Sequence, residues 1–179
     1  MLVGRAWGFD PRTIGSGNIG TTNVARAGGK IPGAVTFVAD VFKGFVPVEL
    51  AQLIFGSVPS ALAIVGLAAF AGSIASVFLK FRGGRGVATS LGVWLGLAPK
   101  PIGIVVAVFG IALALTRIVS LASLMAALAL PPTVAWFGCP GPYILLAIIT
   151  TPLVLLRHRE NIARLTRGEE PSIGPRKTG

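Results

Sequence analysis

An all-α fold, organised as a polytopic transmembrane helix bundle of about six spans with polar cytoplasmic loops, is predicted by composition and by the spacing of charges. Of the 179 residues, 53% are hydrophobic and only 12% are charged, which is unlike a soluble domain. Residues 50–79 and 118–156 contain no Lys, Arg, Asp or Glu. Since about 20 apolar residues cross a bilayer, the second stretch must fold back on itself.

Glycine, proline and charged residues divide the apolar sequence into six spans within a single predicted domain, residues 1–179. We expect spans at residues 34–55, 61–79, 87–98, 102–116, 118–137 and 143–156. At about 1.5 Å per residue, the third, fourth and sixth are short for a full crossing. Tilting, extension beyond these limits or partial crossing would accommodate them. Residues 1–33 form an N-terminal segment and residues 157–179 a cytoplasmic tail.

The basic residues indicate how the chain is oriented in the membrane. The net charge is +10, but the cations lie at the ends of apolar runs and are not interleaved with aromatics, so we expect no nucleic acid partner. If the segment before the first span is cytoplasmic, 14 of the 16 basic residues are cytoplasmic, as the positive-inside rule requires. Lys43 then lies inside a span and Lys100 outside the cell. The single cysteine, Cys139, excludes an internal disulfide and a multi-cysteine metal site, and we expect no metal or cofactor.

The first of three polar segments, residues 15–26, predicts an anion site. Its glycines permit a turn whose N–H groups converge on a phosphate. Polar side chains add donors and a positive charge: Ser16, Asn18, Asn23 and Arg26. A plain glycine-rich connector is the alternative that composition allows. A dinucleotide fingerprint is excluded, because no buried strand precedes the glycines and no βαβ unit follows them.

The second and third polar segments repeat this chemistry, and the predicted topology places all three on one face. Residues 80–89 contain three cations and three glycines: Lys80, Arg82, Arg85, Gly83, Gly84 and Gly86. A positive-inside anchor would explain the cations but not the glycines. In residues 158–170, His158, Asn161 and Arg164 follow one another at intervals of three, so on a helix they share one broad face. Histidine exchanges protons near neutral pH.

Asp40 and Lys43 lie inside the first predicted span. Their three-residue spacing lets them neutralise each other on one helix face. Charged residues in a span often mark function, so a structural pair near the site and a direct functional role both stay open.

Taken together, the three segments resemble the motifs of the acyl-phosphate:glycerol-3-phosphate acyltransferase (PlsY) family of bacterial membrane enzymes. Those motifs read G-S-G-N-x-G-A/T-T-N-x-x-R, K-F-K/R-G-G-K/R-G-V-A-T and H-R-x-N-I-x-R-L-x-x-G-x-E. The resemblance covers nearly the whole chain, in the same order and with hydrophobic spans between the motifs.

The resemblance implies transfer of a fatty acyl group from acyl phosphate to the 1-hydroxyl of glycerol 3-phosphate. The products would be lysophosphatidic acid and phosphate, formed during phospholipid biosynthesis at the cytoplasmic face of the bacterial inner membrane, with membrane lipid around the protein. No acyl-CoA is expected. An acyl phosphate is an activated anhydride, so the enzyme mainly has to hold two phosphate-bearing molecules in line.

By matched position, the resemblance implies a role for each motif residue. Ser16, His158 and Asn161 would be catalytic, and His158 would act either as a base or as a hydrogen-bonding orienter. Glu170 would brace the tail. Substrate binding would fall to Ser16, Asn18, Asn23, Arg26, Lys80, Arg82, Gly83, Gly84, Arg85 and Gly86.

Two departures from the family pattern keep alternatives open. Residues 1–5 resemble only the end of the helix that family members carry before their first motif, so we expect either that the start of the chain is misassigned or that this helix is missing. Ser73 follows Gly72 where family members generally have histidine. A catalytically impaired relative is therefore one alternative. A small polytopic transporter or anion-binding membrane protein is another, in which Asp40 and Lys43 would line a substrate path.

Overall fold

The computed structural model describes residues 2–77 and 83–173, and every regular element among them is an α-helix. The chain divides into two compact units, residues 1–97 and residues 98–179. We describe each unit by itself. The all-helical prediction is confirmed.

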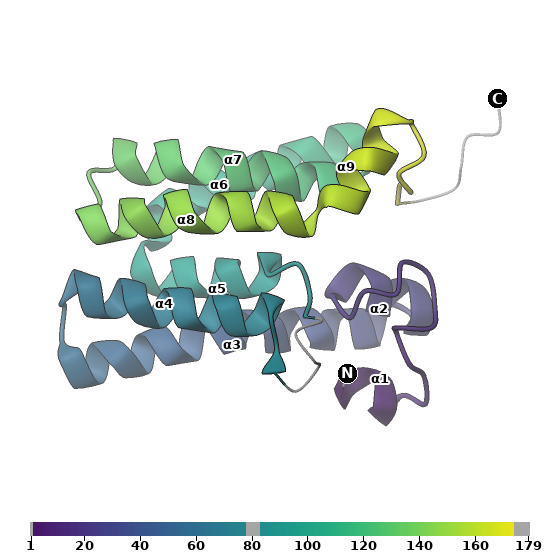
Figure 1. Cartoon of the computed structure of the whole chain (residues 1–179), viewed down its shortest axis with the longest axis horizontal. Helices are drawn as coiled ribbons and strands as arrows, with labels where there is room; N and C mark the ends of the chain where they lie inside the picture. Colours follow the sequence, from purple (N-terminus) through teal and green to yellow (C-terminus); the bar gives the residue numbers. More distant parts are fainter. Residues whose placement is uncertain (1, 78–82, 174–179) are drawn as a thin grey trace. The chain divides into compact units, whose positions relative to one another are not determined.

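The first unit is built on one long helix. Its elements are α1 (Leu2–Ala6), α2 (Thr21–Gly28), α3 (Lys30–Phe55), α4 (Pro59–Ile74) and α5 (Val87–Leu97). A tight turn at Gly56, with φ of +63°, reverses the chain between α3 and α4, and α5 packs against α3 (Figure 1). The end of α4 and the start of α5 therefore lie together, on the side of the unit where α3 begins.

Small residues bring α3 and α5 into backbone contact. A Cβ atom added at Gly92 would overlap the carbonyl group of Val41, and one added at Gly44 would lie 2.7 Å from the backbone nitrogen of Val93. Close approach of this kind is how helices associate where lipid gives no hydrophobic driving force. The amide of Gln52 donates to the Gly96 carbonyl at 2.9 Å, which satisfies one of the carbonyls that the end of α5 leaves without a helical partner.

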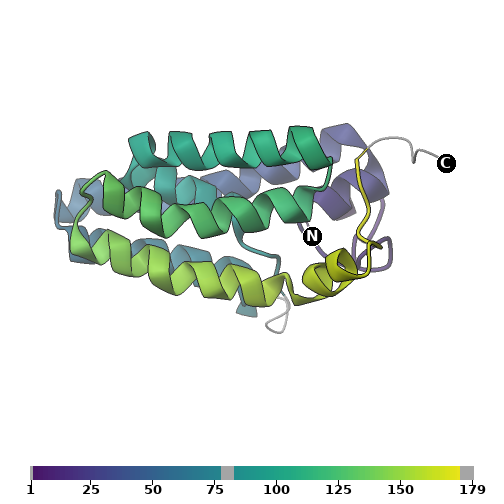
Figure 2. The same cartoon turned by 90° about the horizontal axis from the view of Figure 1, so that it is seen from above.

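The second unit contains α6 (Pro99–Thr116), α7 (Val119–Trp136), α8 (Gly141–Arg157) and α9 (Arg159–Thr166). The contacts run in sequence, α6 on α7 and α7 on α8 (Figure 2). Arg117 ends α6 in the left-handed region, with φ of +58°, and so lets the chain turn sharply. Between α8 and α9 the helix axis bends by 60°.

A hydrogen bond between helices repairs a defect in α7. Pro131 has no N–H group, so the carbonyl of Ala127, four residues earlier, lacks its usual partner. The Thr151 hydroxyl on α8 donates to that carbonyl at 3.0 Å. Buried backbone groups need a partner in the apolar interior, so this bond also fixes α8 against α7.

Each of the six expected spans corresponds to a helix. The helices for the fourth and sixth spans, α6 and α8, extend beyond the expected limits to 18 and 17 residues, whereas α5 stays short at 11. By length and composition, α3, α6 and α7 are each able to cross a membrane. The bent pair α8 and α9 is long and apolar enough to cross when the two helices are counted as one span. The end of the second expected span, residues 78–79, falls outside the described residues. The count of six crossings stays a prediction.

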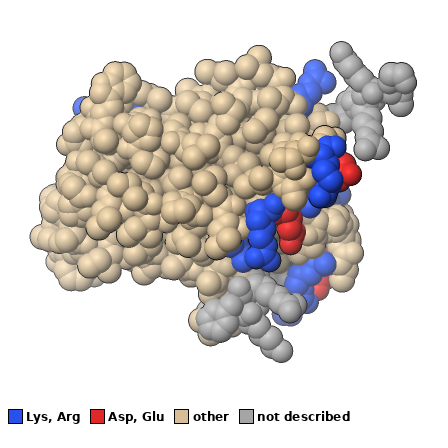
Figure 3. All heavy atoms as spheres, turned by 45° about the horizontal axis from the view of Figure 1, so that its top comes forward, with Lys and Arg blue, Asp and Glu red and all other residues tan. Residues whose placement is uncertain are grey.

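The surface agrees with a membrane location. Large apolar side chains stand exposed on the helices, among them Leu53, Leu115 and Trp136, each at least 80% exposed. Most of the face in Figure 3 carries no Lys, Arg, Asp or Glu. Exposed apolar area on this scale would be unfavourable in water and suits contact with lipid.

Candidate active site

The first polar segment is a loop held together by one buried amide. Asn23 on α2 is only 3% exposed, and its nitrogen lies within hydrogen-bond distance of the carbonyls of Pro11, Ile14 and Asn18, at 2.7 to 2.9 Å. Its oxygen accepts the backbone N–H of Ser16 at 2.9 Å. Every polar atom of this side chain therefore braces the loop backbone. The assignment of Asn23 to substrate binding stays a prediction.

Glycines make this bracing possible. Gly15 and Gly17 have φ of +61° and +67°, a region that side chains disfavour. A Cβ atom at Gly15 would overlap the Asn23 side-chain oxygen. The Asn18 side chain closes the last turn of the loop, because its oxygen accepts the Gly20 N–H at 2.8 Å. Ser16 is left exposed on the loop.

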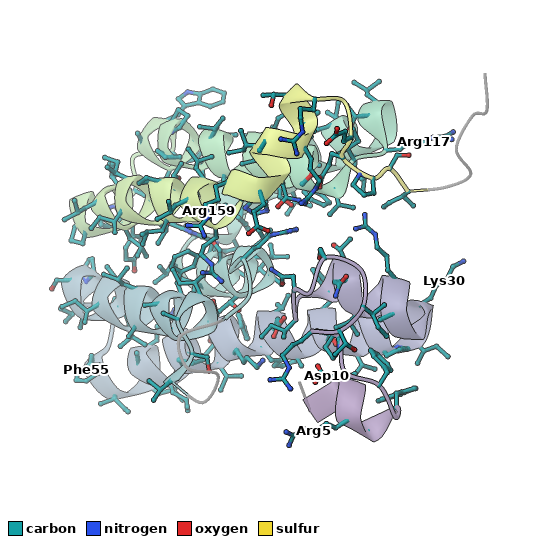
Figure 4. The ribbon with its side chains drawn as sticks, turned by 45° about the vertical axis from the view of Figure 1, so that its right-hand side comes forward. Arg5, Asp10, Lys30, Phe55, Arg117 and Arg159 are labelled. Carbon is teal, nitrogen blue, oxygen red and sulfur yellow. The ribbon has the colours of Figure 1, made fainter. Side chains whose placement is uncertain are left out.

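An ion pair fixes the entry to the loop. The Arg12 guanidinium contacts both carboxylate oxygens of Asp10, with a closest distance of 2.6 Å, and the Arg12 N–H donates to the same carboxylate. These hydrogen bonds and the nearby positive charge lower the pKa of Asp10 to about 2. Figure 4 shows Asp10 on the side of the first unit where α3 begins at Lys30, away from its end at Phe55.

The helix after the loop carries the remaining residues of the first motif. Arg26 is exposed in the last turn of α2. The helix packs tightly on α3, since a Cβ atom at Gly33 would lie 2.6 Å from that of Ala25. Thr21, which the sequence analysis did not select, has a buried hydroxyl with no hydrogen-bond partner in the part of the chain that the structure describes. Only the structure could have identified it.

The second polar segment lies against the end of α4. Lys80 and Arg82 fall outside the described residues. Gly83 and Gly84 are buried, and the Gly84 N–H donates to the Ser73 carbonyl at 3.1 Å. A Cβ atom at Gly86, where φ is +79°, would lie 2.6 Å from the Phe70 ring. Gly83, where an added Cβ atom would overlap the Ser73 carbonyl oxygen, and Gly86 are therefore required for the close approach of this segment to α4.

The first two motifs meet within the first unit. A Cβ atom at Gly84 would lie 4.0 Å from the Asn18 side-chain oxygen. One loop leads directly into the start of α2 and the other into the start of α5. Helix N-termini offer unpaired N–H groups and a partial positive charge, which favour an anion. With Arg26 and the half-buried Arg85, this region has the composition of a phosphate site.

In the second unit, His158 occupies the corner between α8 and α9. It is 1% exposed, and its Nδ1 lies 2.8 Å from the Val154 carbonyl. Because a carbonyl only accepts, Nδ1 carries a proton. In the neutral form of the ring this contact therefore selects the tautomer whose lone pair is on Nε2.

Asn161 belongs to a buried network around Glu170. Asn161, which is 2% exposed, donates from Nδ2 to Glu170, while the Ser120 hydroxyl and the Arg164 guanidinium donate to the same carboxylate at 2.7 Å. Asn161 Oδ1 is buried and has no hydrogen-bond partner among the described residues. It is an acceptor, so a ligand hydroxyl would suit it.

The same network sets the charge of Glu170. Burial raises the pKa of Glu170, but hydrogen bonds from Ser120, Asn161 and Arg164 and the positive charge of Arg164 outweigh burial, and the pKa is lower than its ordinary value. The carboxylate is therefore ionised at neutral pH. These contacts give Glu170 the geometry of a brace for the tail, and Ser120 is a partner that the sequence analysis missed.

Comparison with known proteins decides the family. The family model described as glycerol-3-phosphate acyltransferase matches residues 1–168. The chain belongs to the glycerol-3-phosphate acyltransferase family. The glycerol-3-phosphate acyltransferase of Rubrobacter xylanophilus is 45% identical over 180 residues, covering 100% of this chain and 89% of the relative. That of Caulobacter vibrioides is 47% identical over 169 residues, covering 94% and 77%.

Solved structures of another family member agree. The crystal structure of PlsY (YgiH), an integral membrane glycerol 3-phosphate acyltransferase in its glycerol 3-phosphate form, matches with a TM-score of 0.93 and 39% identity over 97% of this chain and 86% of that one. The lysophosphatidic acid form matches with a TM-score of 0.90 and 38% identity over the same shares. This acyltransferase is accordingly a membrane protein, and the resemblance inferred from the three motifs is confirmed.

Proposed function

We propose that this acyltransferase transfers a fatty acyl group from acyl phosphate to the 1-hydroxyl of glycerol 3-phosphate, at the cytoplasmic face of the bacterial inner membrane. The products are lysophosphatidic acid and inorganic phosphate, which places the reaction in phospholipid biosynthesis. Family membership supports the acceptor, since the matched PlsY structures are described as glycerol 3-phosphate and lysophosphatidic acid forms. The donor and the bond that forms are the proposal.

One observation carries this proposal. Two glycine loops with cations lie against each other in the first unit, and each opens into a helix N-terminus. Both proposed substrates carry a phosphate, and two adjacent anion-binding loops would hold the two phosphates close together. Arg26 and Arg85 supply the charge, and Ser16, exposed on the first loop, supplies a hydroxyl donor.

The reaction itself requires little covalent chemistry from the protein. The 1-hydroxyl oxygen of glycerol 3-phosphate attacks the acyl carbon, the bond from that carbon to the phosphate oxygen breaks, and phosphate leaves with the electron pair. The hydroxyl proton passes either to Nε2 of His158 or to a substrate phosphate oxygen, in which case His158 orients the substrate. Asn161 Oδ1 accepts a hydrogen bond from a substrate hydroxyl. Backbone N–H groups of the glycine loops stabilise the developing oxyanion.

Phosphate release by the purified protein in detergent tests the proposal. With palmitoyl phosphate, release should depend on glycerol 3-phosphate, and His158→Ala should abolish it while the variant stays folded. Palmitoyl-CoA in place of palmitoyl phosphate should give no product. A folded protein that uses only the thioester would overturn the assigned donor, and one inert with both donors would favour a catalytically impaired relative.

Arg26→Ala tests the acceptor site separately. Loss of the guanidinium should raise KM for glycerol 3-phosphate as well as lower kcat, by about tenfold or more in kcat/KM, because a hydrogen bond to a charged phosphate is lost. Steady-state kinetics with varied glycerol 3-phosphate measure this. Normal kinetics would remove Arg26 from the site.

A further inference from the structure

A charged pair stands in the middle of the otherwise apolar helix α3. Between Lys30 and Glu49 the helix has only two charged residues, Asp40 and Lys43. The Lys43 ammonium donates to the Asp40 carboxylate at 2.7 Å. Charges in an apolar helix are costly and mark functional positions by default, and nothing derived above for the reaction uses this pair.

The pair lies at the level of the start of α5, the helix that follows the second glycine loop. Gly44 packs against Thr89 and Val93 in α5, and Gly92 packs against Val41. These contacts set the first turns of α5 alongside the stretch of α3 around residue 40. Asp40 precedes Gly44 by four residues and so shares the helix face that meets α5. Because the glycine loop leads directly into α5, the pair is at the level of that loop.

The Lys43 side chain points away from the unit's core. It is 65% exposed, against 23% for Asp40. The neighbouring side chains Phe42, Val46 and Leu50 are 55%, 41% and 52% exposed, and together form an apolar surface on α3. The ammonium therefore lies at the edge of an apolar surface, at the level of the second glycine loop. This combination suits an amphiphile with a hydrocarbon chain and a phosphate head.

We propose that Lys43 is a docking cation for the phosphate of the acyl phosphate substrate, and that Asp40 is a positioning residue that orients the Lys43 ammonium. The inference rests on the proposed function, since it assigns a further contact to the same donor. The hydrocarbon chain of the acyl phosphate lies on the apolar surface of α3. The phosphate of the same molecule binds first to Lys43 and then to the second glycine loop. A phospholipid headgroup offers the same phosphate chemistry, so the test separates the two sources.

Steady-state kinetics in detergent without phospholipid provide the first arm. Lys43→Met should raise KM for palmitoyl phosphate about tenfold, the size of one charge-assisted hydrogen bond, and leave KM for glycerol 3-phosphate and the thermal unfolding temperature unchanged. Lys43→Arg should restore most of the affinity. Lys100→Met, which removes an exposed lysine from the start of α6, is the matched control and should change neither KM. If Lys43→Met aggregates, Lys43→Gln takes its place with the same expectation.

Asp40 provides the second arm. Asp40→Asn should raise KM for palmitoyl phosphate by less than Lys43→Met does, and the double variant should be no worse than Lys43→Met alone, because Asp40 acts only through Lys43. Additive effects would overturn the positioning role.

Four results would contradict the inference. An unchanged KM for palmitoyl phosphate in folded Lys43→Met excludes the contact. Equal increases in both KM values with lower thermal stability would make the pair structural. An effect seen only in bilayer discs containing phosphatidylglycerol, and not in detergent, would assign Lys43 to a lipid headgroup. A wild-type protein that releases no phosphate from palmitoyl phosphate would overturn the proposed donor itself, whereas normal wild-type turnover confines any failure to Lys43.

Discussion

Asn23 shows how one side chain can decide the shape of a glycine loop. Its amide nitrogen serves three backbone carbonyls and its oxygen accepts the Ser16 N–H. The sequence motif indicated that an amide was needed there but suggested a ligand as its partner. The bracing role depends on carbonyls 5 to 12 residues away, which no spacing rule identifies.

Asn23→Asp should therefore disable the loop. A carboxylate has no N–H group to donate to these carbonyls and would place a negative charge beside them. We therefore expect kcat/KM to fall about 100-fold or more and the protein to unfold at lower temperature. Asn18→Asp is the matched control. It keeps the oxygen that accepts the Gly20 N–H, and its thermal stability should stay near that of the wild type. Equal losses of stability in the two variants would argue against a special role for Asn23.

Glu170 makes stability depend on pH. Its pKa is lower in the folded protein, so it contributes stability above its ordinary value of 4.5, and this contribution is lost as pH falls through the folded pKa. Thermal unfolding in detergent should show the wild-type unfolding temperature dropping as the pH is lowered below that value. Glu170→Gln should be less stable at neutral pH and should show a weaker drop. A wild type and variant with parallel pH profiles would contradict this.

At the scale of elements, the contact between α3 and α5 is decided by two glycines. The sequence predicts both helices, but glycine is frequent in the apolar runs, so its positions do not indicate which glycines meet. The structure separates them: Gly44 and Gly92 have no room for a side chain, whereas Gly72 has nothing within 4 Å of an added Cβ.

Gly92→Ala should destabilise the first unit. Its methyl group would overlap the Val41 carbonyl, a backbone atom that cannot move alone, and overpacking of this kind costs about 1–3 kcal/mol. Gly72→Ala is the control in the same unit and should be neutral or stabilise by about 0.5–1 kcal/mol, since alanine favours helix over glycine. Thermal unfolding in detergent compares them. A Gly92→Ala variant as stable as Gly72→Ala would mean that α3 and α5 are less closely packed.

The prolines of α7 illustrate what an element needs from its neighbour. The sequence has Pro131 and Pro132 inside an apolar run, and the predicted span runs through them, as α7 does. The helix tolerates Pro131 because the Thr151 hydroxyl on the next helix donates to the Ala127 carbonyl. Which hydroxyl would do so could not be predicted, because it depends on how α8 is rotated against α7.

At the scale of the whole molecule, the charge distribution predicts an orientation in the membrane. The loop between α7 and α8 contains the single cysteine, Cys139, which is partly exposed. The positive-inside assignment places this loop outside the cell and the basic tail inside. Cys139 is therefore a native reporter of topology.

A membrane-impermeant maleimide should label Cys139 in intact spheroplasts. In a Cys139→Ser background, Thr166→Cys at the end of α9, an exposed position, should be labelled only after the membrane is permeabilised. Mass spectrometry of the purified protein measures both. Labelling of Thr166→Cys without permeabilisation would invert the proposed orientation and place the third motif outside.

The fold class, the approximate positions of the long helices and the family could be predicted from the sequence alone. Apolar run length, helix-breaking residues and charge are local properties, and they decide which segments are stable in a bilayer. The sequence also indicated the three motifs. The folded chain was needed to show which polar side chains bind backbone and which keep a buried atom without a hydrogen-bond partner among the described residues. Asn23 and Glu170 have their polar atoms engaged within the fold, while Asn161 presents an acceptor. Those choices depend on hydrogen bonds between residues brought together by folding, and a local pattern does not contain them.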